Sequence, residues 1–255
     1  MVRGEAGDGP SCQRTEGKVK NENTSQRLLL FATPPHACGY LPSRLATTVF
    51  ADPRTANTPE MYTVLSRHGF RRSGDHLYRP QCAECSACVP VRIPVRRFRP
   101  RRSQARVWKR NADLEVVAHD GTFDESHFEL YANYMHARHR GGTMDNPTPD
   151  QYRDFLCSEW AHTLFFEFRV RSRLAAVGVC DRLGDGLSAV YTFFDPELAD
   201  RSLGTYAILW EIERTRRLGL DWLYLGYWIA ASSKMRYKAD YRPQQRLIDG
   251  RWTEA

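Results

Sequence analysis

The chain has 255 residues, 42% of them apolar, and its 37 basic and 30 acidic side chains give a formal net charge of +7. This size and apolar content suit one large or two modest globular domains, and the basic charge favours a polyanionic partner. No apolar run approaches the ~18 residues of a membrane span, and the first 27 residues lack the apolar core of a secretory signal, so we expect a soluble, cytosolic protein.

The first half of the chain is expected to combine a disordered leader with short strands and helices. Residues 1–26 contain almost no large apolar side chain and form the expected leader. Thr58, Pro59 and Gly69 mark the cap, the first turn and the end of a helix. In chain order, we expect a strand at 28–33, that helix at 59–68, a sheet-crossing segment at 70–79, an edge or irregular strand at 91–95, a helix at 104–112 capped by Ser103, and a strand at 114–119.

The second half shows more regular periodicity. In chain order, we expect helices at 123–139 and 149–160, a glycine-containing loop between them at 140–145, an antiparallel meander of strands at 163–170, 174–181 and 187–194, a helix at 204–219 and a strand at 222–227. Strands followed by a helix and a further strand are typical of an α+β layer such as the N-acetyltransferase-like fold.

Four cysteines have the spacing of a metal site. Cys82, Cys85 and Cys88 form a C-x-x-C-x-x-C run, and Cys38 lies in a second, proline-bordered loop. Thiolates are soft ligands, and this spacing lets several sulfur atoms face one zinc ion or iron–sulfur cluster. The alternative is a set of unligated thiols on a turn. We therefore predict a metal at Cys38, Cys82, Cys85 and Cys88, and the pattern leaves zinc and iron–sulfur both open.

A basic stretch at 92–110 contains Phe98 and Trp108 among its arginines. Arginines neutralise phosphates, and exposed aromatic rings stack on unpaired bases, which suits a single-stranded RNA end. The same cations could receive an acidic protein terminus, or they could form a solvated basic face with Trp108 in the core. The sequence contains no phosphate-binding glycine loop, dinucleotide fingerprint or serine-hydrolase elbow, so we expect no nucleotide cofactor.

Seven ordered segments resemble the arginyl-tRNA–protein transferase family, and more closely its bacterial branch, the aspartate/glutamate leucyltransferases. The segments are P-x-x-C-x-Y-L-P-x-R at 35–44, G-F-R-R-S-G at 69–74, Y-R-P-x-C-x-x-C-x-x-C-V-P-V-R at 78–92, S-x-x-Y-T-F-F-D-P at 188–196, S-L-G-T-Y at 202–206, Y-L-G-Y-W-I at 224–229 and K-M-x-Y-K at 234–238.

This resemblance implies an N-acetyltransferase-like (GNAT-type) catalytic domain at 113–252 and a smaller cysteine-bearing α/β domain at 27–112. It also implies transfer of leucine from leucyl-tRNA to proteins with an N-terminal Asp or Glu, which marks them for N-end-rule degradation. Two alternatives stay open at this point: arginine as the donor amino acid, and a non-enzymatic, metal-stapled RNA-binding module.

The chemistry of such a transfer guides the choice of candidate site residues. An aminoacyl ester is already activated, so the enzyme has to position two substrates and manage protons. The candidates for binding the acidic acceptor are the cations Lys109, Arg110, Arg138 and Lys234, and those for pocket walls or hydroxyl donors are Tyr191, Tyr206 and Tyr227, whose alternative role is plain core packing. Glu211 is the predicted base or amine-orienting group, and its alternative is a surface helix carboxylate.

Overall fold

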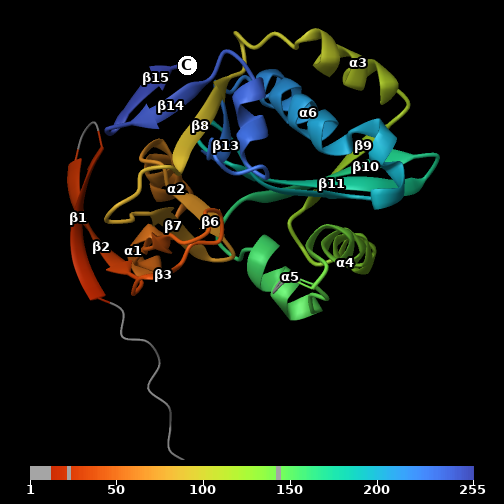
Figure 1. Cartoon of the computed structure of the whole chain (residues 1–255). Coiled ribbons are helices and arrows are strands. Elements are labelled where there is room, and N and C mark those ends of the chain that lie inside the picture. The colour runs from red at the N-terminus through yellow and green to blue at the C-terminus, as the bar shows by residue number, and fades with distance from the viewer. Residues whose placement is uncertain (1–12, 22–23, 142–144) are drawn as a thin grey trace, which may run out of the picture.

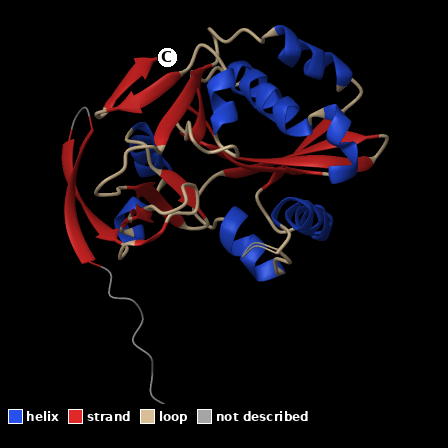
Figure 2. Ribbon diagram, in the orientation of Figure 1, coloured by secondary structure: helices blue, strands red, loops and turns tan. Residues whose placement is uncertain are grey.

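The computed structural model describes residues 13–21, 24–141 and 145–255. The described chain forms a small and a large β-sheet that pack side by side, with helices on both faces of the large sheet (Figure 1 and Figure 2). Among the described residues, no helix is both long and apolar enough to cross a membrane.

The small sheet is antiparallel and comes from the N-terminal third of the chain. In spatial order its strands are β1 (Gln13–Asn21), β2 (Thr24–Ala32), β5 (Thr48–Ala51), β7 (His76–Pro80) and β6 (Arg71–Ser73). Helices α1 (Pro53–Ala56) and α2 (Pro59–Arg67) accompany it, and a short ladder joins β3 (His36–Ala37) to β4 (Leu45–Ala46). Tyr62, Leu65 and Leu77 lie in its buried core.

The large sheet has eight strands. In spatial order they are β15 (Arg251–Glu254), β14 (Gln245–Ile248), β8 (Val89–Pro94), β13 (Trp222–Trp228), β12 (Gly186–Phe194), β11 (Arg173–Arg182), β10 (Thr163–Val170) and β9 (Glu115–Asp120). All neighbours are antiparallel except β12 and β13. A parallel pair needs a crossover connection, and α6 (Leu203–Arg217) supplies it after the 3-10 helix η1 (Pro196–Arg201).

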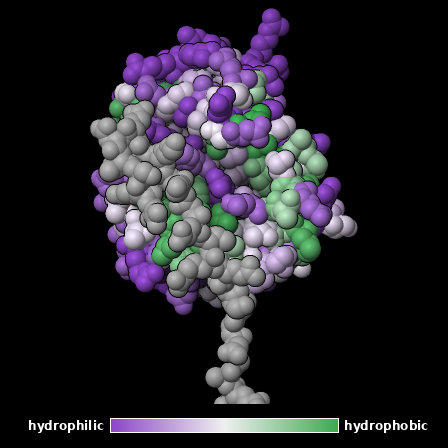
Figure 3. All heavy atoms as spheres, turned by 90° about the vertical axis from the view of Figure 1, so that its left-hand side faces the viewer, coloured by the Kyte–Doolittle hydropathy of each residue, from purple (hydrophilic) through white to green (hydrophobic). Residues whose placement is uncertain are grey.

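Two pairs of helices cover the two faces of this sheet. Figure 1 shows α6 and α3 (Arg102–Arg110) on one face and α4 (Glu125–His139) and α5 (Pro149–Leu156) on the other. Side chains along β10 point alternately to the two faces of the sheet, so β10 contributes to the core on both sides. Phe165 packs in the cluster with α4 and α5, whereas Phe166 and Phe168 pack under α6. Figure 3 shows that hydrophilic residues cover much of the drawn face beside the small sheet, while hydrophobic ones form separate areas.

The predicted helices at 59–68, 123–139 and 204–219 and the predicted meander are confirmed with small changes at their ends. Thr58 caps α2, since its Oγ1 accepts from the Met61 amide at 3.1 Å. By contrast, α3 has Arg101 rather than Ser103 at its N-cap, and 70–79 folds back as the β6–β7 hairpin instead of one strand.

Two further expectations differ from the structure. Residues 13–21 and 24–26 belong to the β1–β2 hairpin, whereas the sequence predicted a disordered leader over 1–26; residues 1–12 and 22–23 lie outside the described residues. Ladder hydrogen bonds satisfy the backbone without needing large apolar side chains, which is why composition missed this hairpin.

Of the two alternatives for 91–95, an edge strand or an irregular one, the edge is wrong, while the ladder of β8 with β13 does carry an irregularity. β8 lies between β13 and β14, and Pro94 is tolerated because it is the last residue of the strand. Because β8 joins the large sheet and α3 packs on α6, residues 89–110 lie with the large sheet and not with the small one. The boundary expected at 112 therefore does not follow the division between the sheets.

Candidate functional site

The candidate site lies where the parallel strands β12 and β13 stop pairing. Their register covers three residue pairs, from Gly186 with Trp222 to Ser188 with Tyr224. Beyond this point the sheet opens between the two strands, and a bulge between Tyr224 and Gly226 changes the register of β13 on β8. Bulges of this kind commonly re-aim side chains next to functional sites. We call the region beyond Ser188 and Tyr224 the strand opening.

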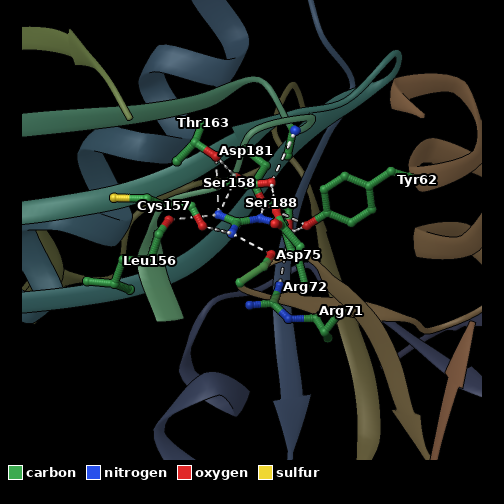
Figure 4. Close-up of polar contacts among 12 residues, drawn as sticks. Tyr62, Arg71, Arg72, Asp75, Leu156, Cys157, Ser158, Thr163, Asp181 and Ser188 are labelled. Carbon is green, nitrogen blue, oxygen red and sulfur yellow. Dashed lines mark hydrogen bonds and ion pairs between the residues drawn. The ribbon is translucent and has the colours of Figure 1, made fainter. Parts of the chain in front are cut away.

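Strand β6 presents two consecutive arginines to opposite sides, as the alternation of a strand requires. Arg72 forms a fully buried ion pair with Asp181, with Nε to Oδ2 at 2.7 Å and Nη2 to Oδ1 at 2.8 Å. It also donates to the carbonyl oxygens of Gly74 and Leu156 at 3.0 and 3.2 Å. Figure 4 shows Arg72 at the centre of this network, which ties the small sheet to the large one.

Arg71 reaches the strand opening itself. Its Nη1 donates to the Ser188 hydroxyl at 3.1 Å and to the Tyr224 carbonyl at 3.3 Å, and its Nη2 donates to the Ala189 carbonyl. These acceptors are the last paired residues of β12 and β13 and the residue that follows on β12. A half-buried guanidinium group is therefore held at the point where the strands part (Figure 4).

A second cation lies beside Arg71. The Lys238 ammonium, carried by the 3-10 helix η2 (Arg236–Asp240), donates to the Tyr227 carbonyl at 3.0 Å and is 7% exposed. A Cβ placed on Gly226 would lie 3.2 Å from both Arg71 Cζ and Lys238 Nζ, so only glycine lets both cations approach β13. Burial and the Arg71 charge lower the pKa of Lys238 to about 7.

Neither Arg71 nor Lys238 forms an ion pair with a carboxylate in the part of the chain that the structure describes. Two adjacent cations without a counter-ion repel each other and attract an anion. The guanidinium group suits a carboxylate in particular, because its planar donors match two oxygen atoms. The strand opening therefore has the chemistry of an anion site.

Glu211 belongs to α6 and is fully buried, which rules out its alternative role as a surface carboxylate. Neither of its carboxyl oxygens has a hydrogen-bond partner among the residues described. Burial raises its pKa to about 8, while the nearby Cys180 thiol and the Arg71 charge act in the opposite direction. Its Oε1 would lie 3.1 Å from a Cβ on Gly178, so the glycine leaves room for the carboxyl group. A buried carboxyl group with a strongly raised pKa near a specific charge is typical of functional sites.

Aromatic residues from β12 and α4 line the outer part of the same region. The Tyr191 ring lies 6.4 Å from Tyr134 and 5.2 Å from Phe155, and its hydroxyl donates to the Met135 sulfur at 3.5 Å. Arg138 lies 5.9 Å from the centre of the Tyr134 ring, and its charge lowers the pKa of both Tyr134 and Tyr191 against the larger effect of burial. Tyr191 and Arg138 are thus brought together on the α4 face.

The other predicted residues do not join this group. Tyr227 is buried and donates to the Gly69 carbonyl at 2.8 Å, so it links β13 to the end of α2. Lys109 and Arg110 are exposed on α3, across the large sheet from Arg138. Tyr206 packs on Trp108, also on the α3 side, and Lys234 is exposed in the turn after β13.

Arg71 and Lys238 were not among the predicted site residues. Both belong to motif segments of the family resemblance, G-F-R-R-S-G and K-M-x-Y-K, and in the second segment the sequence predicts Lys234 rather than Lys238. The sequence signal that could have identified Arg71 is the pair of consecutive arginines on a short strand. Consecutive strand residues point to opposite faces, so the two arginines must have different surroundings.

The four predicted metal ligands approach one another. All four thiols are free and half-buried, and burial together with the charges of Cys38, Cys82 and Cys85 raises the pKa of Cys88 to about 12. Cys82 and Cys85 face each other across an isolated bridge. Among the described residues, however, no three His, Cys, Asp or Glu side chains have a metal-binding arrangement. The chemistry of four thiols suits a soft metal, whereas their present spacing does not form a closed site.

Comparisons with known proteins agree with the resemblance of the motifs. Residues 36–106 match the family profile "Arginine-tRNA-protein transferase, N terminus", and residues 126–248 match "Arginine-tRNA-protein transferase, C terminus". The aspartate/glutamate leucyltransferase of Hahella chejuensis is 52% identical over 225 residues, which are 88% of this chain and 96% of that protein. The enzyme of the same name from Pseudomonas putida KT2440 is 53% identical over 226 residues, or 89% and 96% of the two chains.

A solved structure gives a weaker match. The C-terminal DUF2156 domain of a lysylphosphatidylglycerol synthetase candidate from Agrobacterium fabrum has 10% identity and a TM-score of 0.44, over 65% of this chain and 51% of that one, which is too low to define the fold. The two profiles and the long, highly identical relatives are decisive: this chain is a transferase and belongs to the arginine-tRNA-protein transferase family.

Proposed function

We propose that this protein transfers leucine from leucyl-tRNA to the N-terminal Asp or Glu of proteins and so marks them for N-end-rule degradation in the cytoplasm. The relatives that it matches over 96% of their length carry the name aspartate/glutamate leucyltransferase. The observation that carries the proposal is the strand opening, where two adjacent cations have no carboxylate ion pair among the described residues and Arg71 acts on the buried Glu211 carboxyl group.

The large sheet supports an N-acetyltransferase-like catalytic unit. Its β12–α6–β13 segment forms a parallel pair that opens after three residues and leaves backbone groups of the two strands without ladder partners on each other. An opening of this kind offers donors and acceptors to an extended substrate without unfolding the sheet. In this proposal the small sheet and the cysteine loops form the accessory N-terminal unit.

Arg71 and Lys238 are proposed to bind the acceptor's acidic side chain. An Asp or Glu carboxylate would supply the counter-ion that this cation pair lacks. A peptide with a neutral first side chain would leave both cations uncompensated. Selectivity for acidic N-termini then follows from the cost of leaving charge unpaired at a half-buried site.

Glu211 is proposed to accept a proton from the acceptor's α-ammonium group. A free α-amino group has a pKa of about 8, close to the value of about 8 to which burial raises Glu211. Proton transfer between groups of matched pKa needs little free energy. The neutral amine then attacks the ester carbonyl carbon, the bond from that carbon to the ribose oxygen breaks, and this oxygen takes the proton that Glu211 holds. The attacking nitrogen loses its second proton to the Glu211 carboxylate, which releases it to solvent. An amide and uncharged tRNA result.

The donor side chain is proposed to lie against the aromatic lining formed by Tyr134, Phe155 and Tyr191. These rings offer apolar faces, which suit a leucyl side chain. An arginyl group would require carboxylates in the same place. The transfer assay described next therefore compares leucine with arginine as the donor amino acid.

A transfer assay tests the activity. Purified protein receives separately labelled leucyl-tRNA and arginyl-tRNA together with peptides that begin with Asp, Glu, Asn or Lys. We expect leucine on the Asp and Glu peptides alone. Label on none of the peptides would remove the proposed reaction, and arginine label would replace the donor.

The same assay tests the acceptor site through Arg71→Met and Lys238→Met. Each variant should lower kcat/KM for the Asp peptide by about 30- to 5000-fold, the range expected when one partner of a buried charge pair is lost. Arg251→Met, at an exposed position of β15, is the matched control and should transfer like the wild type. Wild-type rates in both Arg71→Met and Lys238→Met would refute the acceptor assignment.

We also propose a bound metal at Cys38, Cys82, Cys85 and Cys88, which would pin the two cysteine loops together. Elemental analysis of anaerobically purified protein should find zinc or iron, and a Cys82→Ser, Cys85→Ser variant should lose it. Metal-free wild-type protein that stays folded and active would contradict this proposal.

A further inference from the structure

A cavity of about 340 Å³ lies between α3, α6 and the β9 edge, and Glu211 is not among its lining residues. Its lining includes Trp108 of α3, Leu114, and Tyr206, Trp210, Arg214 and Arg217 of α6. Its volume is within the range of small-molecule and cofactor sites. The transfer chemistry proposed above uses none of these residues.

Two aromatic walls of the cavity are held firmly. Trp210 packs on Phe166 at 4.7 Å and on Phe168 at 5.6 Å, so the sheet fixes its ring. Trp108 stacks on Tyr206 with centroids 5.4 Å apart and planes tilted by 38°, yet 36% of Trp108 remains exposed. A large aromatic residue with one supported and one exposed side is suited to stacking on a planar ligand.

The cations at the cavity differ in what they already bind. Arg217 and Arg216 both pair with Glu213, at 2.8 and 2.6 Å. Arg214, which also lines the cavity, has a buried Nε without a hydrogen-bond partner in the described chain. A buried donor without an acceptor is costly, and an incoming anionic oxygen would satisfy it.

Helix α3 extends this cationic character beyond the cavity. Residues 101–110 hold five basic and no acidic side chains. Arg102, Arg106 and Lys109 are exposed, and none of them forms an ion pair with another described residue. The helix packs on α6, so these free charges are carried by the same helix as Trp108.

We propose that this cavity binds an unpaired nucleotide of the tRNA substrate, with its base stacked on Trp108 and its phosphate on Arg214. The inference rests on the proposed function only for the identity of the RNA. Aromatic stacking beside arginine donors is the chemistry with which proteins hold unpaired RNA. The free cations of α3 follow the phosphates on either side of that nucleotide.

Direct binding of uncharged tRNA tests the inference without any transfer step. Trp108→Ala should raise the tRNA Kd about tenfold, the usual effect of removing one stacking partner, and Trp108→Phe should restore most of the affinity. Arg214→Met should weaken binding and reduce the slope of log K against log salt by about 0.7 to 0.9, as for one lost phosphate contact. Arg216→Met is the matched control on the same helix and should change the Kd less than twofold.

Transfer kinetics supply a second readout. In Trp108→Ala the KM for leucyl-tRNA should rise by the same factor, while kcat and the KM for the acceptor peptide stay unchanged. Thermal unfolding checks that each variant is folded, and the Phe variant separates stacking from packing. The proposal is overturned if folded Trp108→Ala and Arg214→Met both bind tRNA with wild-type affinity. It is also overturned if a small anionic aromatic compound competes with tRNA for the cavity and single-stranded RNA does not. Trp108-dependent tRNA binding without any leucine transfer would refute the proposed function alone.

Discussion

Replacing Arg72 with Met should destabilise the protein far more than the same change at its neighbour Arg71. Arg72 and Asp181 are both fully buried, and the guanidinium group also donates to Gly74, Leu156 and Thr163 at 3.0 to 3.2 Å. The methionine side chain fills most of the volume but leaves the Asp181 carboxylate buried without its cation.

The expected loss follows from that uncompensated charge. Breaking a buried ion pair by removing one partner costs about 3–5 kcal/mol. Asp181 keeps hydrogen bonds from the Tyr62 hydroxyl at 2.7 Å and the Thr163 hydroxyl at 2.8 Å, which favours the lower half of the range. For a chain of this size, about 3–4 kcal/mol corresponds to a fall in Tm of roughly 6–16 °C.

Arg71→Met leaves no buried carboxylate behind and removes one member of a mutually repelling pair. Its loss is therefore limited to hydrogen bonds with Ser188 and the Tyr224 and Ala189 carbonyls, about 0.5–1.5 kcal/mol each, and the relief of repulsion from Lys238 offsets part of it. Urea unfolding of both variants, followed by fluorescence, measures the difference. Equal losses of stability in the two variants, or a loss below about 1 kcal/mol for Arg72→Met, would refute the division between a structural and a functional arginine.

Three further predictions concern the strand opening. Glu211→Gln should lower kcat by about 10²- to 10⁴-fold. In the wild type the free energy of unfolding should fall as the pH rises from about 4.5 to 8, because burial raises the pKa of Glu211 from 4.5 to about 8 and the folded state holds the extra proton in that window. Glu211→Gln should not show this fall, and parallel curves of stability against pH for the two proteins would contradict the prediction. In wild type the KM for the Asp peptide should rise with pH above about 7, where Lys238 loses its charge, and Lys238→Met should flatten that dependence in initial-rate measurements. Gly226→Ala should cost about 1–2 kcal/mol, because φ is +87° and the new methyl group would lie 3.2 Å from both cations; an unchanged urea midpoint together with an unchanged acceptor KM would show that the cations do not need the glycine.

Local sequence signals predicted the elements whose formation depends on local chemistry. The Thr58 cap, Pro59 and Gly69 gave α2 its ends, and the alternating runs gave β10 to β12 their antiparallel order. These signals act between residues that are neighbours along the chain or across a short turn. Period and capping could therefore identify them.

Long-range pairing could not be read in the same way. β8 enters the large sheet between β13 and β14, which come more than a hundred residues later in the chain. Pro94 suggested an edge or irregular strand, and only the partner strands exclude the edge. The same holds for Arg71 and Arg72: alternation separates their side chains, but the packing of the two sheets decides which one meets Asp181.

The protonation of Lys238 connects acceptor binding to selectivity. With a pKa of about 7, the free site holds Lys238 largely uncharged above neutral pH, and burial is the main cause. A carboxylate that enters beside it favours the charged form, so an acidic acceptor should take up a proton on binding. An Asn peptide of nearly the same shape has no charge with which to hold that proton. Discrimination between Asp and Asn should therefore weaken as the pH rises above 7 in the wild type, and Lys238→Met should discriminate less and with little pH dependence. Calorimetric titration in buffers of different ionisation enthalpy measures the proton uptake. If the Asp peptide binds without proton uptake, Lys238 does not take part in acceptor recognition.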